Sequence, residues 1–187
     1  MNIEISEVAN LPSRFGKFKV KAFKVADKEH LVIYKDKLEE IPVVRVHSEC
    51  LTGDAIGSLK CDCRDQLEYA LELANKTNGM VIYLRQEGRN IGLLNKINAY
   101  ALQDKGLNTI EANHQLGFEA DERTYEMVTY ILHHFGIHKI KLLTNNPHKI
   151  NSIDDIEIVE RVPIIMDSNE HNADYLDIKK DEMGHLF

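Results

Sequence analysis

The stretch "GMVIYLRQEGRNIG", residues 79–92, joins a continuous apolar run to a polar turn that contains glycine. Residues 79–84 are almost all apolar, which is typical of a strand buried on both faces of a sheet. The following segment, NIGLLNKINAYALQDKG, has the spacing of a helix that ends at Gly106. A buried strand, a short turn and a helix in this order indicate an α/β protein.

The segments on either side of this stretch follow the same alternation. Helical spacing is found in RDQLEYALELAN, in residues 122–135 and in the tail NADYLDIKKDEMGHL, whereas IPVVRVHS, KIKLLTNN and IEIVERVPII are typical of strands. The first 46 residues are rich in strand patterns, including the alternating stretch KFKVKAFKV. We therefore predict an α/β fold with a mixed sheet flanked by helices and a β-rich N-terminal segment. Because the chain has no repeat and no linker-like segment, residues 1–187 are predicted to form a single domain.

The charge balance excludes some classes of partner. The 187 residues include 23 Lys and Arg and 30 Asp and Glu, a net charge of -7. This acidity argues against a nucleic-acid partner, because nucleic-acid surfaces are usually basic. It is compatible with a small phosphorylated substrate that meets local cations or a divalent metal. No apolar run approaches the roughly 20 residues that span a bilayer, and the N-terminus lacks signal-peptide features, so we expect a cytoplasmic protein without a membrane partner.

All three cysteines, Cys50, Cys61 and Cys63, lie in the stretch HSECLTGDAIGSLKCDC, residues 47–63. Clustered cysteines in a reducing compartment are more often metal ligands or catalytic groups than disulfides, and thiolates favour zinc. Three protein ligands with a fourth position left to water are typical of a catalytic zinc site. The alternatives are buried apolar cysteines, a structural site completed by His47, and a redox pair.

His47-Ser48-Glu49 matches the H-x-E element of the zinc nucleobase deaminases, in which the glutamate shuttles protons. Those enzymes also carry P-C-x-x-C, whereas this chain has K-C-D-C. A deaminase is therefore the second hypothesis for function, and a non-catalytic nucleotide-binding module is the third.

Three further stretches carry residues suited to phosphates. In RQEGRNIG, Gly88 permits a tight turn, and Arg85 and Arg89 offer planar guanidinium groups; the alternative is a solvated turn. In LLTNNPHKI, Asn146 is a candidate N-cap, and a lysine at position 149 in the first helical turn suggests a nearby anion.

The third stretch, EANHQLGFEADERT (111–124), is predicted to be a loop. Asp121 and Arg123 lie at the start of the predicted helix that follows. The plain alternative for this pair is an N-cap at Asp121 and a surface arginine at position 123.

Taken together, these stretches resemble the GTP cyclohydrolase II family. The shared motifs are RVHSECLTGD (45–54), CDC (61–63), RQEGRNIG (85–92), NKINAYALQDKG (95–106), EANHQLGF (111–118), ADER (120–123), LLTNNPHK (142–149), ERVP (160–163) and MGHL (183–186). The resemblance runs from about residue 2 to the end of the chain. The segment after Lys149 is shorter than usual in the family, and the sequence lacks the dihydroxybutanone phosphate synthase domain fused in many relatives, so we expect only the GTP step.

The resemblance implies a hydrolase at the entry to riboflavin biosynthesis. The family opens the imidazole ring of GTP, releases C8 as formate and cleaves the α–β phosphoanhydride to release pyrophosphate, giving a diaminopyrimidine ribosylamine phosphate. It implies one catalytic Zn²⁺ per subunit on Cys50, Cys61 and Cys63, Mg²⁺ with the triphosphate, and a homodimer.

The resemblance also implies roles for individual residues. The GTP contacts fall on Arg45, Val46, His47, Ser48, Glu49, Gln66, Glu87, Gly88, Arg89, Thr109, Thr144 and Lys149. Asp121 matches the proton acceptor and Arg123 the nucleophile toward the α-phosphorus. A protonated guanidinium is a poor nucleophile, so electrostatic stabilisation of the transition state is the alternative for Arg123. Tyr100 is expected to face the guanine, the alternative being a core aromatic.

Overall fold

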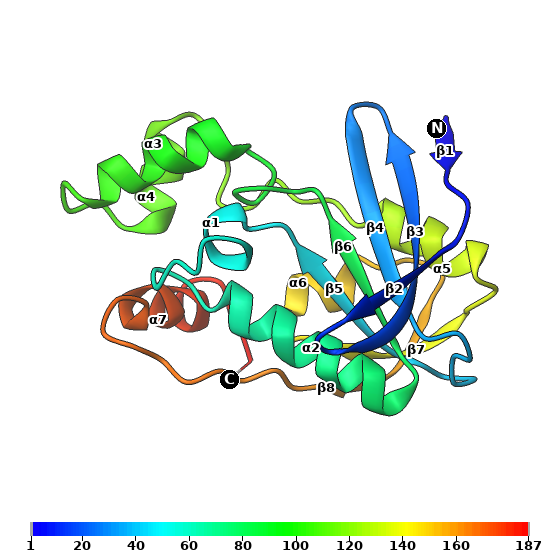
Figure 1. Cartoon of the computed structure of the whole chain (residues 1–187). Coiled ribbons are helices and arrows are strands. Elements are labelled where there is room, and N and C mark those ends of the chain that lie inside the picture. Colours follow the sequence, from blue (N-terminus) through cyan, green and yellow to red (C-terminus); the bar gives the residue numbers. More distant parts are fainter. Residues whose placement is uncertain (1, 187) are drawn as a thin grey trace.

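The computed structural model describes residues 2–186 and contains one eight-stranded sheet with helices on both faces (Figure 1). The strands are β1 (Ile3–Ile5), β2 (Ala9–Ser13), β3 (Gly16–Val25), β4 (Lys28–Tyr34), β5 (Val43–Ser48), β6 (Met80–Leu84), β7 (Lys139–Leu143) and β8 (Glu157–Val162). The helices are α1 (Leu51–Asp54), α2 (Cys63–Thr77), α3 (Leu93–Gln103), α4 (Thr109–Gln115), α5 (Glu126–His134), α6 (Pro147–Asn151) and α7 (Ala173–Asp181).

The sheet is mixed, as the sequence predicts. Its strand order is β1-β3-β4-β6-β5-β7-β8, and β2 pairs with β3 beside this path. The N-terminal strands pair antiparallel, and β4 joins β6 in the same sense. Strand β5 is parallel to both β6 and β7, and β7 is parallel to β8. The carboxyl ends of β5, β6 and β7 therefore meet at one edge, where ligands of open α/β sheets usually bind.

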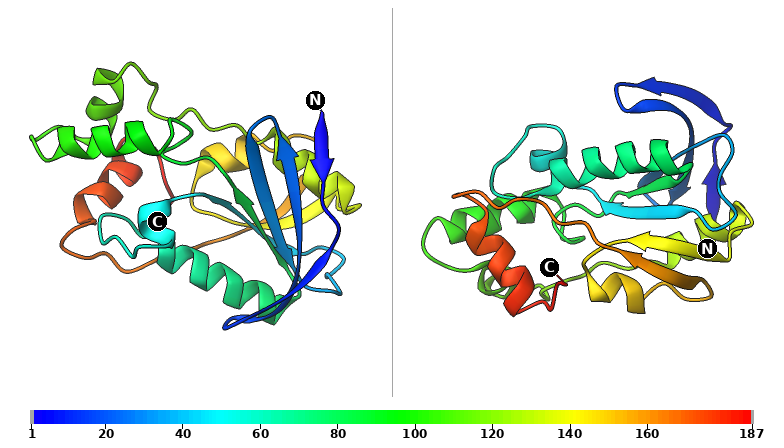
Figure 2. Two further views of the ribbon diagram at one scale, coloured as in Figure 1. Left: turned by 45° about the horizontal axis from the view of Figure 1, so that its top comes forward. Right: turned by 90° about the horizontal axis from the view of Figure 1, so that it is seen from below.

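The core has two layers because side chains of the buried strands alternate between the two faces. Val81 points to the face covered by α2, where Ala70 and Ala74 pack against the sheet. Ile82 points to the opposite face, which is covered by α5 and its Ile131. Figure 2 shows α2 and α6 on opposite sides of the sheet. Burying each aliphatic side chain contributes about 1.5–3 kcal/mol, so this core holds the carboxyl edge of the sheet rigidly.

The segment 111–124, predicted as a loop, is helical in its first part. Residues Thr109–Gln115 form α4, and Asn108 closes a capping box with Glu111. This N-x-x-E signature is a known start signal for a helix, and the polar composition of the segment obscured it. Helix α5 begins at Glu126, later than predicted, and its N-cap residue is Tyr125. Asp121 is therefore not an N-cap.

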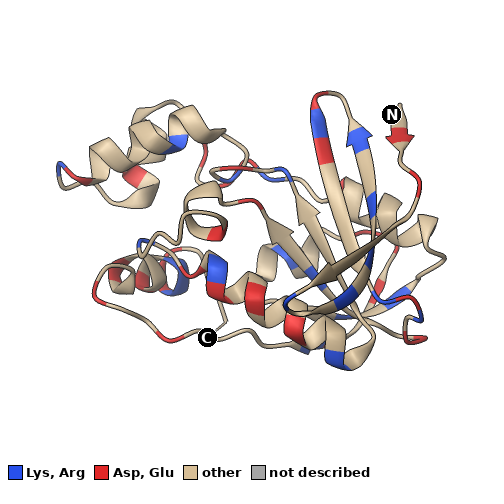
Figure 3. Cartoon of the chain, viewed as in Figure 1, with Lys and Arg blue, Asp and Glu red and all other residues tan. Residues whose placement is uncertain are grey.

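Three helices lie beyond the carboxyl edge of the parallel strands. Figures 1 and 2 show α3 and α4 projecting beyond the ends of β5 and β6, with α7 on another side of the same region. Acidic and basic residues both lie on α2 (Figure 3). Within residues 2–186, no helix is both long enough and apolar enough to cross a membrane.

Candidate active site

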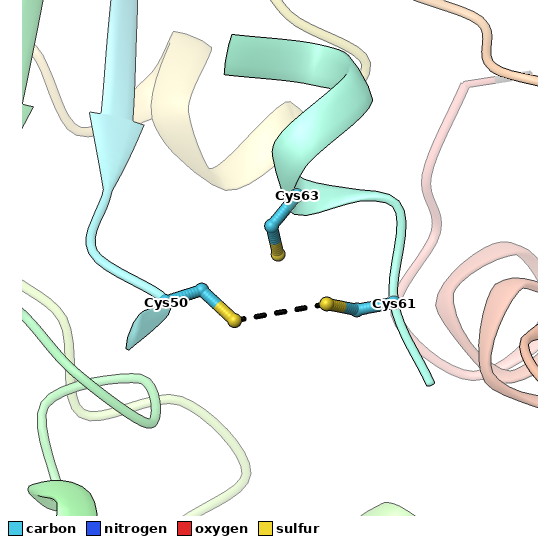
Figure 4. A group of neighbouring side chains, drawn as sticks. All are labelled: Cys50, Cys61 and Cys63. Atoms are coloured by element: carbon cyan, nitrogen blue, oxygen red, sulfur yellow. Dashed lines mark hydrogen bonds between the residues drawn. The ribbon is translucent and has the colours of Figure 1, made fainter. Parts of the chain in front are cut away.

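The three cysteines converge at the carboxyl end of β5. Cys50 precedes α1, Cys61 lies in the loop after α1, and Cys63 is the first residue of α2. Their sulfur atoms all lie within 4.8 Å of one another, with 3.7 Å between those of Cys50 and Cys61. Figure 4 shows the three thiols pointing toward a common centre. Sulfur ligands of a tetrahedral zinc ion lie about 3.8 Å apart, so these three thiols fit one metal ion.

Gly53 keeps the space beside the sulfur atoms open. A Cβ atom at this position would lie 2.8 Å from Cys61 Sγ and 3.1 Å from Cys50 Sγ. Only a residue without a side chain fits this place without displacing a thiol. The cluster of Cys50, Cys61 and Cys63 can therefore hold a metal ion, and a fourth coordination position is left to a non-protein ligand.

A buried ion pair between Lys96 and Glu87 lies against the cysteine cluster. Lys96 Nζ donates to Cys50 Sγ at 3.1 Å and to Glu87 Oε1 at 2.8 Å. Glu87 Oε2 accepts from the backbone N–H of Leu51 at 2.7 Å, which ties the turn after β6 to the start of α1. Lys96 is absent from the predicted site. Its position four residues before Tyr100, on the same face of one helix, is the signal that identifies it.

The pKa values of Cys50 and Cys61 are shifted in opposite directions from their usual value. Hydrogen bonds from Cys61 and Cys63 and the charge of Lys96 lower the pKa of Cys50. The neighbouring Cys50 side chain, together with burial, raises the pKa of Cys61 to about 11. A divalent cation reverses this effect, because coordinating thiols are deprotonated.

A cavity of about 580 Å³ opens beside the cysteines at the carboxyl ends of β5, β6 and β7. Seven Lys and Arg residues and four Asp and Glu residues line it, although the whole chain carries a net charge of -7. The basic residues are Arg45, Lys60, Arg89, Lys96, Arg123, Lys149 and Lys179. This local reversal of charge suits the cavity to an anionic ligand.

Arg45 lies at the base of the cavity. Its guanidinium donates to Gln66 Oε1 at 2.6 Å and to the backbone carbonyl of Leu143 at 3.1 Å. Burial lowers the pKa of Arg45 to about 10, so the group stays charged at neutral pH. Among the described residues, the buried Nε atom has no hydrogen-bond partner.

The turn after β6 is strained and joins two parts of the site. Gly88, Arg89 and Asn90 have φ values of +61°, +59° and +77°, a conformation that costs a non-glycine residue about 1–3 kcal/mol. Arg89 Nη1 donates to the carbonyl of Ala120 at 3.1 Å, and the carbonyl of Arg89 accepts from the N–H of Glu122 at 3.2 Å. The strained turn therefore holds the segment that carries Asp121.

Asp121 and Arg123 form a bidentate pair. Arg123 Nε donates to Asp121 Oδ1 at 2.8 Å, and Arg123 Nη2 donates to Asp121 Oδ2. Burial alone would lower the pKa of Arg123, but the bond to Asp121 and the charge interactions with Tyr125, Asp121 and Tyr175 together raise it. Arg123 lines the cavity, whereas its partner Asp121 is not among the lining residues. A cationic guanidinium is therefore presented to the cavity.

Thr144, in the loop after β7, and Lys149, on α6, line the cavity. Asn146 caps α6 by accepting from the N–H of His148 at 2.9 Å, as the sequence predicts. Lys149 is buried and donates to the carbonyl of Val46 at 2.8 Å. Burial, followed by the charges of Arg45 and Arg123, holds its pKa well below the usual value.

Most of the predicted site residues line this cavity, and three do not. Those that line it are Arg45, Ser48, Glu49, Cys50, Cys61, Cys63, Gln66, Glu87, Gly88, Arg89, Tyr100, Thr109, Arg123, Thr144 and Lys149. The side chain of Val46 belongs to the core, and Asp121 pairs with Arg123 without lining the cavity itself. His47 is buried with its Nε2 atom 3.0 Å from Asp54 Oδ1, so it supports the loop of Cys50 and is not part of the cysteine cluster.

The fold and the site define an α/β protein with a three-thiol cluster that can hold a metal ion, beside a cation-lined pocket. The family model described as GTP cyclohydrolase II matches residues 4–163. Two proteins named GTP cyclohydrolase-2 are similar over the whole chain: that of Campylobacter hominis is 67% identical and 96% covered, and that of Campylobacter fetus subsp. fetus is 65% identical and 97% covered. The chain belongs to the GTP cyclohydrolase II family of hydrolases.

More distant similarity extends to other proteins. The GTP cyclohydrolase-2 of Helicobacter pylori (strain Shi470) is 53% identical, and the match covers 98% of both chains. Among solved structures, RibBX, a two-domain 3,4-dihydroxy-2-butanone 4-phosphate synthase from A. baumannii, superposes with a TM-score of 0.45 at 18% identity over 88% of this chain and 40% of that chain.

Proposed function

We propose that this protein opens the imidazole ring of GTP, releases formate and pyrophosphate, and thereby performs the first step of riboflavin biosynthesis. The observation that carries the proposal is the placement of the three-thiol cluster in the wall of a cation-lined cavity. The cavity volume of about 580 Å³ lies within the usual range of about 300–1,000 Å³ for small-molecule sites. Ring and phosphates can therefore occupy the same cavity.

Cys50, Cys61 and Cys63 are the proposed ligands of one Zn²⁺ ion, because soft thiolates in an open three-ligand set suit zinc. When bound, zinc supplies Lewis acidity and an activated water for the attack on C8. The Lys96 ammonium offsets part of the negative charge that three thiolates bring into a buried site. Mg²⁺ is proposed to accompany the triphosphate, because this ion is usually bound through the phosphates of the substrate.

The remaining residues bind and orient the nucleotide in this proposal. Arg89 Nη2 is buried and has no hydrogen-bond partner among residues 2–186, so it has a donor left for a ligand. Arg45 likewise keeps its Nε donor. The other proposed contacts are Val46 (through its main chain), His47 (through the loop that it supports), Ser48, Glu49, Gln66, Glu87, Gly88, Thr109, Thr144 and Lys149.

Asp121 is proposed to keep the guanidinium of Arg123 protonated. Arg123 is proposed to stabilise the charge on the α-phosphoryl group. The bidentate pairing keeps the guanidinium protonated, which favours this electrostatic role over nucleophilic attack. Trapping the enzyme with GTP and mapping any guanylyl adduct tests the choice. An adduct on Arg123 would contradict the electrostatic role.

Tyr100 is proposed to orient the reacting purine. Its hydroxyl lies 3.5 Å from Thr52 Oγ1, and its ring lies 5.7 Å from Lys96 Nζ beside the cysteine cluster. We predict that Tyr100→Phe lowers kcat far more than it weakens GTP binding, because the hydroxyl contributes chiefly in the transition state. Steady-state kinetics and GTP titration measure the two effects. Equal loss of both, or no loss of either, counts against this role.

The oligomeric state of the protein and its location in the cell are also part of the proposal. Leu93, Leu94 and Ile97 on the projecting helix α3 are exposed, and an exposed apolar group of this kind favours burial against a second copy. We propose a homodimer in which each cytoplasmic subunit, residues 1–187, acts as one catalytic domain. Light scattering of the Leu94→Glu variant tests the interface, since a dimer that uses α3 should dissociate.

The decisive experiment is GTP turnover with and without a zinc chelator, following formate and pyrophosphate separately. Both products should appear with the metal and disappear with the chelator. Release of ammonia would support a deaminase instead. If the protein carried no zinc and Cys61→Ser kept full ring-opening activity, the proposed mechanism would be wrong.

A further inference from the structure

Lys179, on the C-terminal helix α7, reaches the loop that carries two of the cysteines. Its Nζ atom donates to Asp62 Oδ1 at 3.1 Å, and both side chains are buried. Asp62 is the residue between Cys61 and Cys63. The pair therefore links a segment near the end of the chain to the loop between two proposed zinc ligands, 117 residues apart in sequence.

Asp62 makes one local and one long-range side-chain contact. It occupies the N-cap position of α2, yet its side chain makes no capping hydrogen bond. An aspartate at an N-cap ordinarily accepts from the first turn of its own helix. Here one carboxylate oxygen accepts from Lys179 and the other accepts from Gln66 Nε2. The orientation of this carboxylate is thus determined by residues outside the cysteine loop.

The contacts continue from Asp62 into the sheet. Gln66 Oε1 accepts from Arg45 Nη2 at 2.6 Å, and Arg45 Nη1 donates to the carbonyl of Leu143 at the end of β7. One continuous series of hydrogen bonds therefore runs from α7 through the cysteine loop to β5 and β7. Loss of the cation at position 179 would leave a buried carboxylate unpaired beside the thiols, which such a site does not tolerate without rearrangement.

We infer that Lys179 is a positioning residue for the metal centre: through Asp62 it holds the Cys61–Cys63 loop in the geometry that retains the metal. The inference rests on the proposed zinc site. Groups that orient the ligands of a metal typically change its affinity by about 10–100-fold when they are removed. Because α7 lies outside residues 4–163, which match the family model, this role assigns a function to the C-terminal segment.

The test measures zinc affinity and zinc release from the loaded protein to an excess of a chromogenic chelator. Lys179→Met and Asp62→Asn should each weaken zinc binding by about 10-fold or more, whereas Lys179→Arg should stay close to the unchanged protein. Lys180→Met is the matched control, because Lys180 is the adjacent lysine and is exposed; its zinc affinity should not change.

The double variant Lys179→Met/Asp62→Asn decides whether Lys179 acts through Asp62. If it does, the double variant loses zinc no faster than the faster single variant. Multiplied effects, or a Lys179→Met protein that folds and holds zinc like the unchanged protein, overturn the inference. If Lys179→Met does not fold, unchanged zinc release from Asp62→Asn overturns it. An unchanged protein that binds no zinc refutes the proposed metal centre itself, so the two failures are distinguishable.

Discussion

Gly53 controls the space inside the cysteine cluster. It is buried in the short helix α1, and the three thiols approach it from different segments. Its backbone lies outside the left-handed region, so the requirement for glycine here is one of space. The cluster is therefore sensitive to a single methyl group.

We predict that Gly53→Ala weakens zinc binding by about 10-fold or more, since overpacking of a tight site costs about 1–3 kcal/mol. Chelator competition measures the affinity. Ala55→Ser, at an exposed position just after the same helix, is the control and should bind zinc normally. Unchanged affinity in Gly53→Ala would show that the metal lies elsewhere.

Lys149 is the residue through which anion binding should depend on protons. Burial and neighbouring positive charges depress its pKa, and a bound polyanion would favour the ammonium form and raise that pKa. We predict net proton uptake when pyrophosphate binds, and tighter binding as the pH falls toward neutrality. Calorimetry in buffers of different ionisation enthalpy measures the uptake. Lys149→Met should lose it, and equal uptake by both proteins would exclude Lys149 as its source.

At the scale of elements, β4 supports the strained turn after β6. His30 is buried on β4, and its Nδ1 atom accepts from the backbone N–H of Arg85 at 3.0 Å. The ring must be neutral at Nδ1 to accept this bond. The entrance to the turn that presents Glu87 and Arg89 therefore depends on a histidine that the predicted site did not include.

The pH dependence of the free energy of unfolding should reveal the protonation of His30. Burial, then Lys28 and Arg85, lower the pKa of His30 from 6.5 to about 4. The unfolded chain binds the proton first as pH falls, so stability is intact above pH 6.5 and decreases from there toward pH 4. We predict a contribution of about 2 kcal/mol lost between neutral pH and pH ~5. Urea unfolding of the natural protein and His30→Gln measures it. The same pH slope in both proteins would contradict the assignment.

At the scale of the whole molecule, the hydrophobic core is separate from the cysteine cluster. The buried clusters on the two faces of the sheet contain none of the three cysteines. The metal should therefore add stability by binding to the folded state, without being needed to form that state.

We predict that chelation abolishes turnover while the protein still unfolds cooperatively, at a somewhat lower midpoint temperature. Circular dichroism during heating, with and without chelator, measures this. Re-addition of zinc is the control and should restore activity. Complete loss of structure on chelation would indicate a structural zinc site.

Patterns local in sequence determined much of the architecture. Continuous apolar runs are read from neighbouring residues, so the buried strand at 79–84, the mixed sheet and the helix cap at Asn146 were predictable. The motifs also identified the family, and most of the site residues that they predicted line the cavity. The start of α4 was indicated only by the two residues of a capping box, and the polar composition of the segment led instead to the prediction of a loop.

Tertiary structure alone decided which distant polar groups meet. Lys96 against Cys50, Lys179 against Asp62, and His30 against Arg85 join residues separated by 46, 117 and 55 positions. The sequence by itself determined most of the elements, the three thiols and the family, because periodicity and motif spacing act over short stretches. The folded structure decided the charge of the cavity and the partners of Asp62, the residue between Cys61 and Cys63. Coulomb interactions and hydrogen bonds depend on distance in space and on burial.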